Sequence, residues 1–246
     1  MKLFLANGCS NTAGSEIDEH NMVYCHESSW PKWVADHYGM EHFNIAEPGS
    51  GNEQINRSTI ITVSNLIENE KLNPKDLIVG ILWSGFDRYE YWSEEKDKFR
   101  SFSMSSPKKF SPNQHITKYI EYRSLVETKD YAYYKNLYYM FNTAKFLESY
   151  GIEYYFTNCM NNFVHPNDLK ASDNFKGNYA NLLNLYGSRI DRHLGFFNGS
   201  DVFIQLLNDT PRSKLGTGFH WGEEGQKKYA MHFIEHMEHE KANTRD

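Results

Sequence analysis

The sequence predicts an α/β fold: a three-layer α/β/α sandwich around a mostly parallel, flavodoxin-like sheet of about five strands. Short apolar runs alternate along the chain with longer segments whose apolar residues recur at helical spacing. One run, at residues 76–82, is continuously apolar, as expected for a central strand covered on both faces. Such alternation is typical of a parallel sheet between two helical layers, and right-handed crossovers favour the flavodoxin-like strand order.

The first part of the chain contains two expected strands and the helix between them. Residues 3–7 form an apolar run that predicts a buried first strand. A helix should begin after Ser29, whose side chain can cap it, with Pro31 in its first turn and a stop near Gly39. Residues 42–46 are the expected second strand.

A helix and the central strand follow. A turn rich in glycine at residues 48–52 leads into a helix over about 53–70. The residues that recur at helical spacing in this segment are Ile55, Thr59, Ile60, Val63, Leu66 and Ile67. The continuous apolar run at 76–82 is then the third strand.

Residues 88–128 do not fit the alternation. This segment is long, polar and rich in aromatic residues, and it follows the third strand directly. It should therefore emerge at the end of the sheet where ligands bind. We interpret it as an insertion that forms a lid or a substrate-binding region, with a decorative loop as the alternative.

The second half of the chain completes the pattern. The expected elements are a helix at 130–150, a strand at 153–157, a helix around 178–194, a weaker strand near 202–205 and a last helix over 223–240. We expect the whole chain, residues 1–246, to form a single domain.

Composition and charge exclude several classes of protein. With 39% hydrophobic and 24% charged residues, the chain can bury a core. A net charge of −6 argues against a nucleic-acid partner. The three cysteines form no metal-ligand spacing and no even disulfide set, which favours a reducing compartment. We find no signal-peptide core, no membrane-length apolar stretch and no nucleotide-binding glycine motif, and we expect a soluble, cytoplasmic protein without a cofactor or membrane span.

Ser10 lies in a turn of small residues, Gly-Cys-Ser-Asn-Thr-Ala-Gly at 8–14, directly after the first strand. A serine there should stand exposed at the carboxyl end of a strand, where open α/β sheets bind ligands. Nucleophilic serine needs a base, and His220 precedes the last helix on the same side of the sheet. Gly49, after the second strand, lets the backbone approach a substrate closely. We predict Ser10 as the nucleophile, His220 as the base, and the N–H groups of Ser10 and Gly49 as oxyanion donors.

In the order of these blocks the chain resembles the SGNH (GDSL-like) hydrolase superfamily. The matching blocks are Gly-Cys-Ser-Asn-Thr-Ala-Gly at 8–14, Asn-Ile-Ala-Glu-Pro-Gly-Ser-Gly-Asn at 44–52 and His-Trp-Gly-Glu-Glu-Gly at 220–225. The resemblance implies the SGNH-hydrolase fold, with Ser10 as nucleophile, Gly49 as oxyanion glycine and His220 as base. It also implies cleavage of a carboxylic ester, such as an acetyl ester on a carbohydrate, through an acyl-enzyme. The partner implied is a small-molecule or carbohydrate ester.

The sequence departs from that superfamily at two positions. Phe86 stands where the Gly-x-Asn-Asp block has its asparagine, and Ser84 or Asn158 could supply the oxyanion donor instead. Thr217 stands where Asp-x-x-His has its aspartate, so a backbone carbonyl could orient the imidazole in a Ser-His dyad. Asp209 is the nearest acid upstream of the histidine.

Other interpretations follow from these departures and from other residues. The chain could be a catalytically degenerate module that binds a glycan or a protein partner through the aromatic insertion, or a transferase that passes an acyl group to a sugar hydroxyl. Cys9 could be a thiol nucleophile, but in an extended segment it points away from Ser10. His232 and His236 share a face of the last helix and could bind a metal, with a solvated helix face as the alternative.

Overall fold

The computed structural model describes residues 2–17, 25–103, 114–126, 129–158, 206, 209, 210 and 220–243. Its helices and strands are β1 (Leu3–Gly8), α1 (Ser10–Ala13), α2 (Trp30–His37), β2 (Glu41–Asn44), α3 (Asn52–Glu68), β3 (Leu77–Trp83), β4 (Arg88–Ser93), β5 (Lys98–Ser103), α4 (Gln114–Val126), α5 (Lys129–Ser149), β6 (Glu153–Asn158) and α9 (Glu223–Asn243). The expected helix at 178–194 and strand at 202–205 lie outside the described residues.

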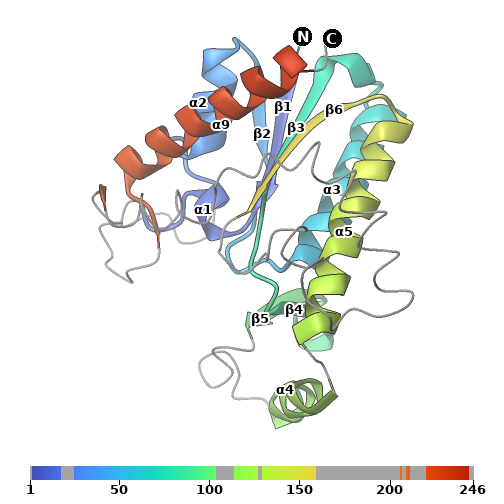
Figure 1. Cartoon of the computed structure of the whole chain (residues 1–246). Coiled ribbons are helices and arrows are strands. Elements are labelled where there is room, and N and C mark those ends of the chain that lie inside the picture. The colour runs from blue at the N-terminus through green and yellow to red at the C-terminus, as the bar shows by residue number, and fades with distance from the viewer. Residues whose placement is uncertain are drawn as a thin grey trace.

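Four parallel strands form the main sheet in the order β2-β1-β3-β6. This order matches the flavodoxin-like prediction for the strands that the structure describes, with the second strand beside the first and the third on the other side. All four strands run in the same direction, so their carboxyl ends share one edge of the sheet. That edge carries α1, the turn after β2 and the start of β4 (Figure 1).

Helices cover both faces of the sheet (Figure 1), and β1, β3 and β6 alternate their side chains between two hydrophobic cores. Leu5 of β1, Val79 of β3 and Phe156 of β6 lie in the core on the side of α3 and α5. Phe4 and Tyr155 lie in the other core, beneath α2 and α9. The three-layer α/β/α prediction is therefore confirmed.

The helix α2 begins where the sequence predicts but is capped differently. Ser29 is its N-cap residue, yet the serine side chain makes no capping hydrogen bond. The backbone N–H of Trp30 instead donates to Oε1 of Gln226, 3.0 Å away in α9. An amide from the far end of the chain thus satisfies a donor that has no partner within its own helix. Gly39 adopts a left-handed φ of 62° just beyond the helix end, as expected for a stop signal.

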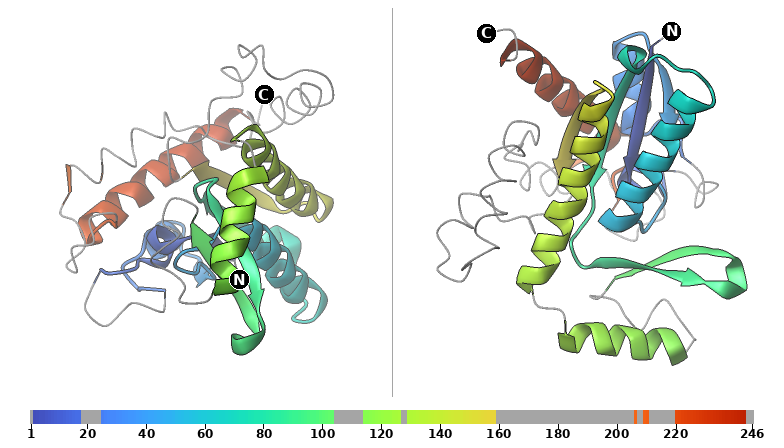
Figure 2. Two further views of the ribbon diagram at one scale, coloured as in Figure 1. Left: turned by 90° about the horizontal axis from the view of Figure 1, so that it is seen from below. Right: turned by 90° about the vertical axis from the view of Figure 1, so that its right-hand side faces the viewer.

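The segment after β3 forms regular structure that the sequence interpretation did not specify. β4 and β5 pair as an antiparallel hairpin, and α4 follows it. Figure 2 shows the hairpin and α4 beyond one end of the layered body. None of the helices in the described ranges combines the length and the apolar character needed to cross a membrane.

Candidate active site

Ser10 opens α1, two residues after Gly8 ends β1. A side chain on Gly8 would collide with the Thr12 hydroxyl and would come within 2.8 Å of the Leu82 carbonyl oxygen. Glycine is therefore required for the tight passage from strand to helix. Ser10 itself is only 6% exposed. The expectation of an exposed serine is wrong, because the imidazole of His220 lies against its hydroxyl.

The fold brings Ser10 and His220 together and adds a carboxylate. His220 Nε2 lies 2.8 Å from Ser10 Oγ, and His220 Nδ1 lies 2.8 Å from Glu16 Oε2. The side chains of His220 and Glu16 are only 19% and 10% exposed. The tautomer that satisfies both contacts has Nδ1–H donating to the carboxylate, which leaves the Nε2 lone pair to accept from the serine hydroxyl. The three side chains thus form one continuous chain of hydrogen bonds.

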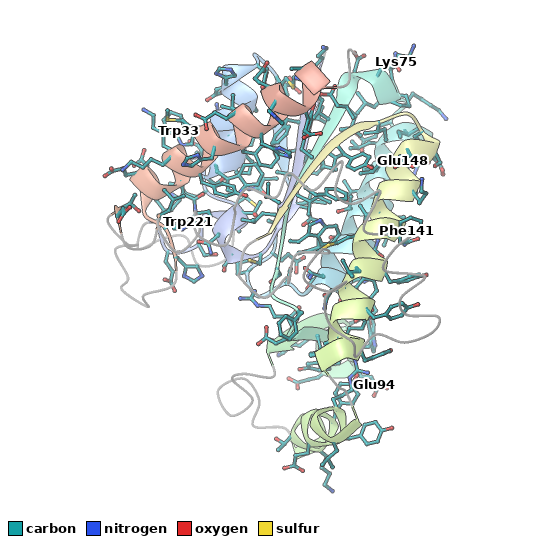
Figure 3. All side chains as sticks on the ribbon, viewed as in Figure 1. Trp33, Lys75, Glu94, Phe141, Glu148 and Trp221 are labelled. Carbon is teal, nitrogen blue, oxygen red and sulfur yellow. The ribbon has the colours of Figure 1, made fainter. Side chains whose placement is uncertain are left out.

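Contacts at the start of α9 fix the position of His220. The backbone N–H of Trp221 donates to Asn11 Oδ1 over 3.3 Å, and Gln226 Nε2 donates to the Asn11 carbonyl oxygen over 2.9 Å. Trp221, labelled in Figure 3, is fully buried and stacks on Tyr229 with ring centroids 4.7 Å apart. His220 therefore sits beside the residue that follows Ser10.

Glu16 is a site residue that the sequence reasoning missed. Gly14 ends α1 with a left-handed φ of 70°, and the N–H of Ser15 donates to the Ser10 carbonyl oxygen over 2.9 Å. Glu16 also has a left-handed φ, 65°. These features turn the chain back, so that the carboxylate reaches the histidine beside Ser10.

The expectation of a Ser-His dyad oriented by a backbone carbonyl is wrong, because the Glu16 carboxylate contacts Nδ1 of His220. Asp209 is exposed, and Thr217 lies outside the described residues. One feature of the sequence could have identified Glu16. It is the sole acidic residue among the first 17 residues, and it follows Ser10 in the same turn-rich segment.

Gly49 lies in a tight turn beyond β2. The N–H of Ser50 donates to the Glu47 carbonyl oxygen over 3.1 Å, and Gly49 has a φ of 87°, as in a type II turn. β2 is the hydrogen-bonded neighbour of β1, as expected. The Asn44 side chain donates to the Thr12 carbonyl oxygen over 2.8 Å and so joins the end of β2 to α1. An oxyanion role for Gly49 stays a prediction.

Ser84 follows β3 and is fully buried. Its N–H donates to Asn52 Oδ1 over 2.7 Å, and its carbonyl oxygen accepts from Asn52 Nδ2 over 3.0 Å. The backbone N–H is thus engaged, while the hydroxyl has no hydrogen-bond partner among the described residues. Asn158 is the last residue of β6, in register with Trp83. Oxyanion roles for Ser84 and Asn158 also stay predictions.

The other candidates belong to the core or to the surface. Cys9 is 1% exposed and lies in the core beneath α2 and α9. His236 is 7% exposed and packs edge-on against Tyr155, with ring centroids 5.8 Å apart. The side chain of His232 is 40% exposed and lies near Glu235. The interpretation of His232 and His236 as one solvated face is therefore wrong.

The β4–β5 hairpin is tied to the segment that carries Gly49. Gln54 donates to Glu47 over 2.6 Å and accepts from Ser101 of β5 over 2.6 Å. Arg88 of β4 donates to the Ser50 carbonyl oxygen over 3.4 Å. The insertion therefore begins beside the turn after β2.

Comparisons with known proteins give one family match and several similar structures. Residues 13–158 match a family described as "Family of unknown function (DUF6071)". No curated protein matches the sequence.

Three solved structures are similar to this chain. A protein described as lipolytic, of the G-D-S-L family from Desulfitobacterium hafniense, is 11% identical with a TM-score of 0.44, over 94% of this chain and 97% of that one. Another G-D-S-L lipolytic protein, from Veillonella parvula, is 9% identical with a TM-score of 0.44, over 96% and 97%. An acetyl xylan esterase from the rumen bacterium Butyrivibrio proteoclasticus is 9% identical with a TM-score of 0.47, over 98% of this chain and 64% of that one.

Proposed function

The chain belongs to a family of unknown function, DUF6071, and we propose that it is a serine esterase of the SGNH type. The observation that carries the proposal is the 2.8 Å contact between Ser10 Oγ and His220 Nε2, two residues 210 positions apart in the chain. A hydroxyl and an imidazole within hydrogen-bond distance at the carboxyl edge of a parallel sheet are the parts that acyl transfer needs. The buried surroundings strengthen the interaction between them.

The proposed reaction has two stages. Ser10 attacks the acyl carbon while His220 Nε2 accepts the hydroxyl proton, and His220 then returns that proton to the departing alcohol. Water next attacks the acyl carbon while His220 accepts its proton, and His220 returns that proton to Ser10 Oγ as the acyl group leaves as a carboxylic acid. The N–H groups of Ser10 and Gly49 are the proposed oxyanion donors. Ser10 suits this role because the first N–H groups of a helix lack an intrahelical partner.

Aromatic side chains on the insertion favour a carbohydrate as the alcohol part of the substrate. Trp92 and Phe99 face each other across β4 and β5 with ring centroids 5.1 Å apart. They are 50% and 38% exposed, although large apolar side chains are usually buried. The Arg57 guanidinium covers one face of Phe99, 3.9 Å from the ring centroid, whereas the half-exposed ring of Trp92 suits the apolar face of a sugar. An acetyl ester on a carbohydrate is therefore the substrate we propose to test beside simple aryl esters.

A second candidate function is a catalytically silent module that binds a glycan or a protein. The residue that favours it is Phe86, which has no side-chain donor to place where the superfamily has its oxyanion asparagine. Such a module would bind through the aromatic insertion and would hydrolyse nothing.

Replacing Ser10 with alanine tests the esterase proposal. Ser10→Ala should reduce hydrolysis of a short-chain aryl ester by a factor on the order of 10⁶, as in an efficient serine hydrolase that loses its nucleophile. Its thermal unfolding should stay close to that of the wild type, because only a hydroxyl is removed. Hydrolysis is followed by release of the aryl alcohol.

Ser15→Ala is the matched control. Ser15 is buried in the same segment, and its hydroxyl has no hydrogen-bond partner among the described residues, so this variant should keep the wild-type rate. Full activity in Ser10→Ala would overturn the proposal. A folded wild type that hydrolyses no ester yet binds a glycan would favour the module.

A further inference from the structure

We propose that Glu16 is the positioning residue that holds the His220 imidazole in its working tautomer, an inference that rests on the esterase function proposed above. Its Oε2 lies 2.8 Å from His220 Nδ1, the ring nitrogen that faces away from Ser10. The superfamily resemblance places this acid three residues before the histidine, where this chain has Thr217. Glu16 takes over that role from the opposite end of the chain.

Burial gives the contact its strength. The side chains of Glu16 and His220 are 10% and 19% exposed, so water competes little for the carboxylate. A hydrogen bond to a charged acceptor in such surroundings is stronger than one between neutral groups. The carboxylate holds the proton on Nδ1 and stabilises the imidazolium that forms when Nε2 accepts the serine proton.

The backbone of residues 14–16 is arranged for this contact. Glu16 has a left-handed φ of 65°, a conformation that a non-glycine residue seldom adopts. Gly14 at φ 70° and the hydrogen bond from Ser15 N–H to the Ser10 carbonyl fold the segment into a compact turn. Unfavourable backbone conformations of this kind persist where the surrounding structure enforces them, often at functional sites.

The nucleophile and the acid therefore lie on one seven-residue segment, and only the base comes from elsewhere. His220 reaches them because the start of α9 is held to Asn11, within the same segment, through Trp221 and Gln226. The acid thus belongs to residues 10–16, while the base belongs to the segment just before α9. This arrangement differs from the superfamily pattern, in which the acid and the base lie on one segment.

Glu16→Gln tests the proposal, because glutamine keeps the size of the side chain and removes the charge. We expect kcat to fall by roughly 10³- to 10⁴-fold while KM changes less than about threefold, the pattern of a group needed only in the transition state. Glu16→Asp keeps the charge, so its kcat should lie between those of Glu16→Gln and the wild type. Asp209→Asn is the matched control, because it neutralises an exposed acid near His220 in the sequence, and it should keep the wild-type kcat.

A spectroscopic readout separates positioning from general stabilisation. In proton NMR, the His220 Nδ1 proton should give a strongly downfield resonance in the wild type and in Ser10→Ala, and this resonance should disappear in Glu16→Gln. Thermal unfolding and circular dichroism show whether each variant is folded. If Glu16→Gln does not fold, the same comparison is made with Glu16→Asp, whose resonance should be shifted.

The outcomes distinguish this inference from the function on which it rests. A folded Glu16→Gln variant that keeps the wild-type kcat, or an unchanged Nδ1 resonance, would overturn the role of Glu16 and leave Ser10 untouched. If the folded wild type hydrolyses no ester, the esterase function fails, and the Nδ1 resonance still decides whether Glu16 holds the imidazole.

Discussion

At the scale of single residues, two glycines shape the turn that presents Ser10. Gly8 admits the Thr12 hydroxyl and the Leu82 carbonyl into space that a side chain would fill. Gly14 has a left-handed φ of 70°, and a side chain there would lie 2.9 Å from atoms of His26. Gly8 and Gly14 are thus required by packing on either side of Ser10.

A buried histidine should make the stability of the protein depend on pH. Burial lowers the pKa of His236 from 6.5 to about 4, and the nearby positive charge of His239 acts in the same direction. Between these pH values the unfolded chain binds a proton that the folded protein excludes, so stability falls as pH is lowered from 6.5 to about 4. The free energy of unfolding should therefore be about 2 kcal/mol lower at pH 5 than at pH 7.

Urea unfolding of the wild type and of His236→Gln at pH 7 and pH 5 measures this effect. The wild type should lose about 2 kcal/mol more than the variant between the two pH values. Equal losses in the two proteins would show that His236 titrates alike in the folded and unfolded states.

The residues of the site differ in how far the sequence could predict them. The proximity of Ser10 and His220 could be predicted because each sits in a short block at a strand end or before a helix. Glu16 could not be paired with His220, because the contact depends on left-handed backbone at residues 14 and 16 and on the docking of α9. The hydrogen bonds between Ser84 and Asn52 could not be predicted either, because the two residues are far apart in the chain.

At the scale of elements, buried asparagines join the helices on one face to the sheet. Asn52, at the start of α3, pairs with both backbone groups of Ser84 and donates to Asn136 Oδ1 of α5 over 2.8 Å. Asn136 in turn donates to the Phe86 carbonyl oxygen over 3.3 Å. These bonds fix where the chain leaves β3 and enters the insertion.

Asn52→Ala should therefore be strongly destabilising. The variant leaves the buried N–H and carbonyl of Ser84 without their partners, and we expect a loss of about 2–4 kcal/mol in the free energy of unfolding. Asn65→Ala in the same helix is the control, because Asn65 is exposed and its side chain bonds to the exposed side chains of Asn69 and Glu70. It should change stability by less than about 0.5 kcal/mol. Equal effects of the two substitutions, measured by urea unfolding, would contradict the proposed role of the network.

The strands of the main sheet and the helices that cover it could be predicted better than the structure of the insertion. β3 is apolar at every position because helices cover both its faces, and α5 spans Lys129–Ser149 against an expectation of 130–150. The β4–β5 hairpin was missed because its connection, residues 94–97, has no glycine or asparagine. Asp97 instead adopts the left-handed conformation there, with a φ of 49°.

At the scale of the whole molecule, the parallel sheet gathers the site from distant parts of the chain. The carboxyl ends of β1, β2 and β3 share one edge, and α9 returns from the far end of the sequence to pack beside α2. Strand order and layers could be predicted because alternation and right-handed crossovers leave few topologies. The proximity of Ser10 and His220 could be predicted from the order of the elements. The distance between them could not, because no sequence pattern gives it.

The most direct test of the account is the reaction of the whole protein with a fluorophosphonate, followed by mass spectrometry of the labelled peptides. We predict a single adduct on Ser10 in the wild type, none in Ser10→Ala, and labelling slowed by orders of magnitude in His220→Gln. An unlabelled Ser10 in the folded wild type, or labelling that does not depend on His220, would contradict the claim that these two residues form a nucleophile and its base.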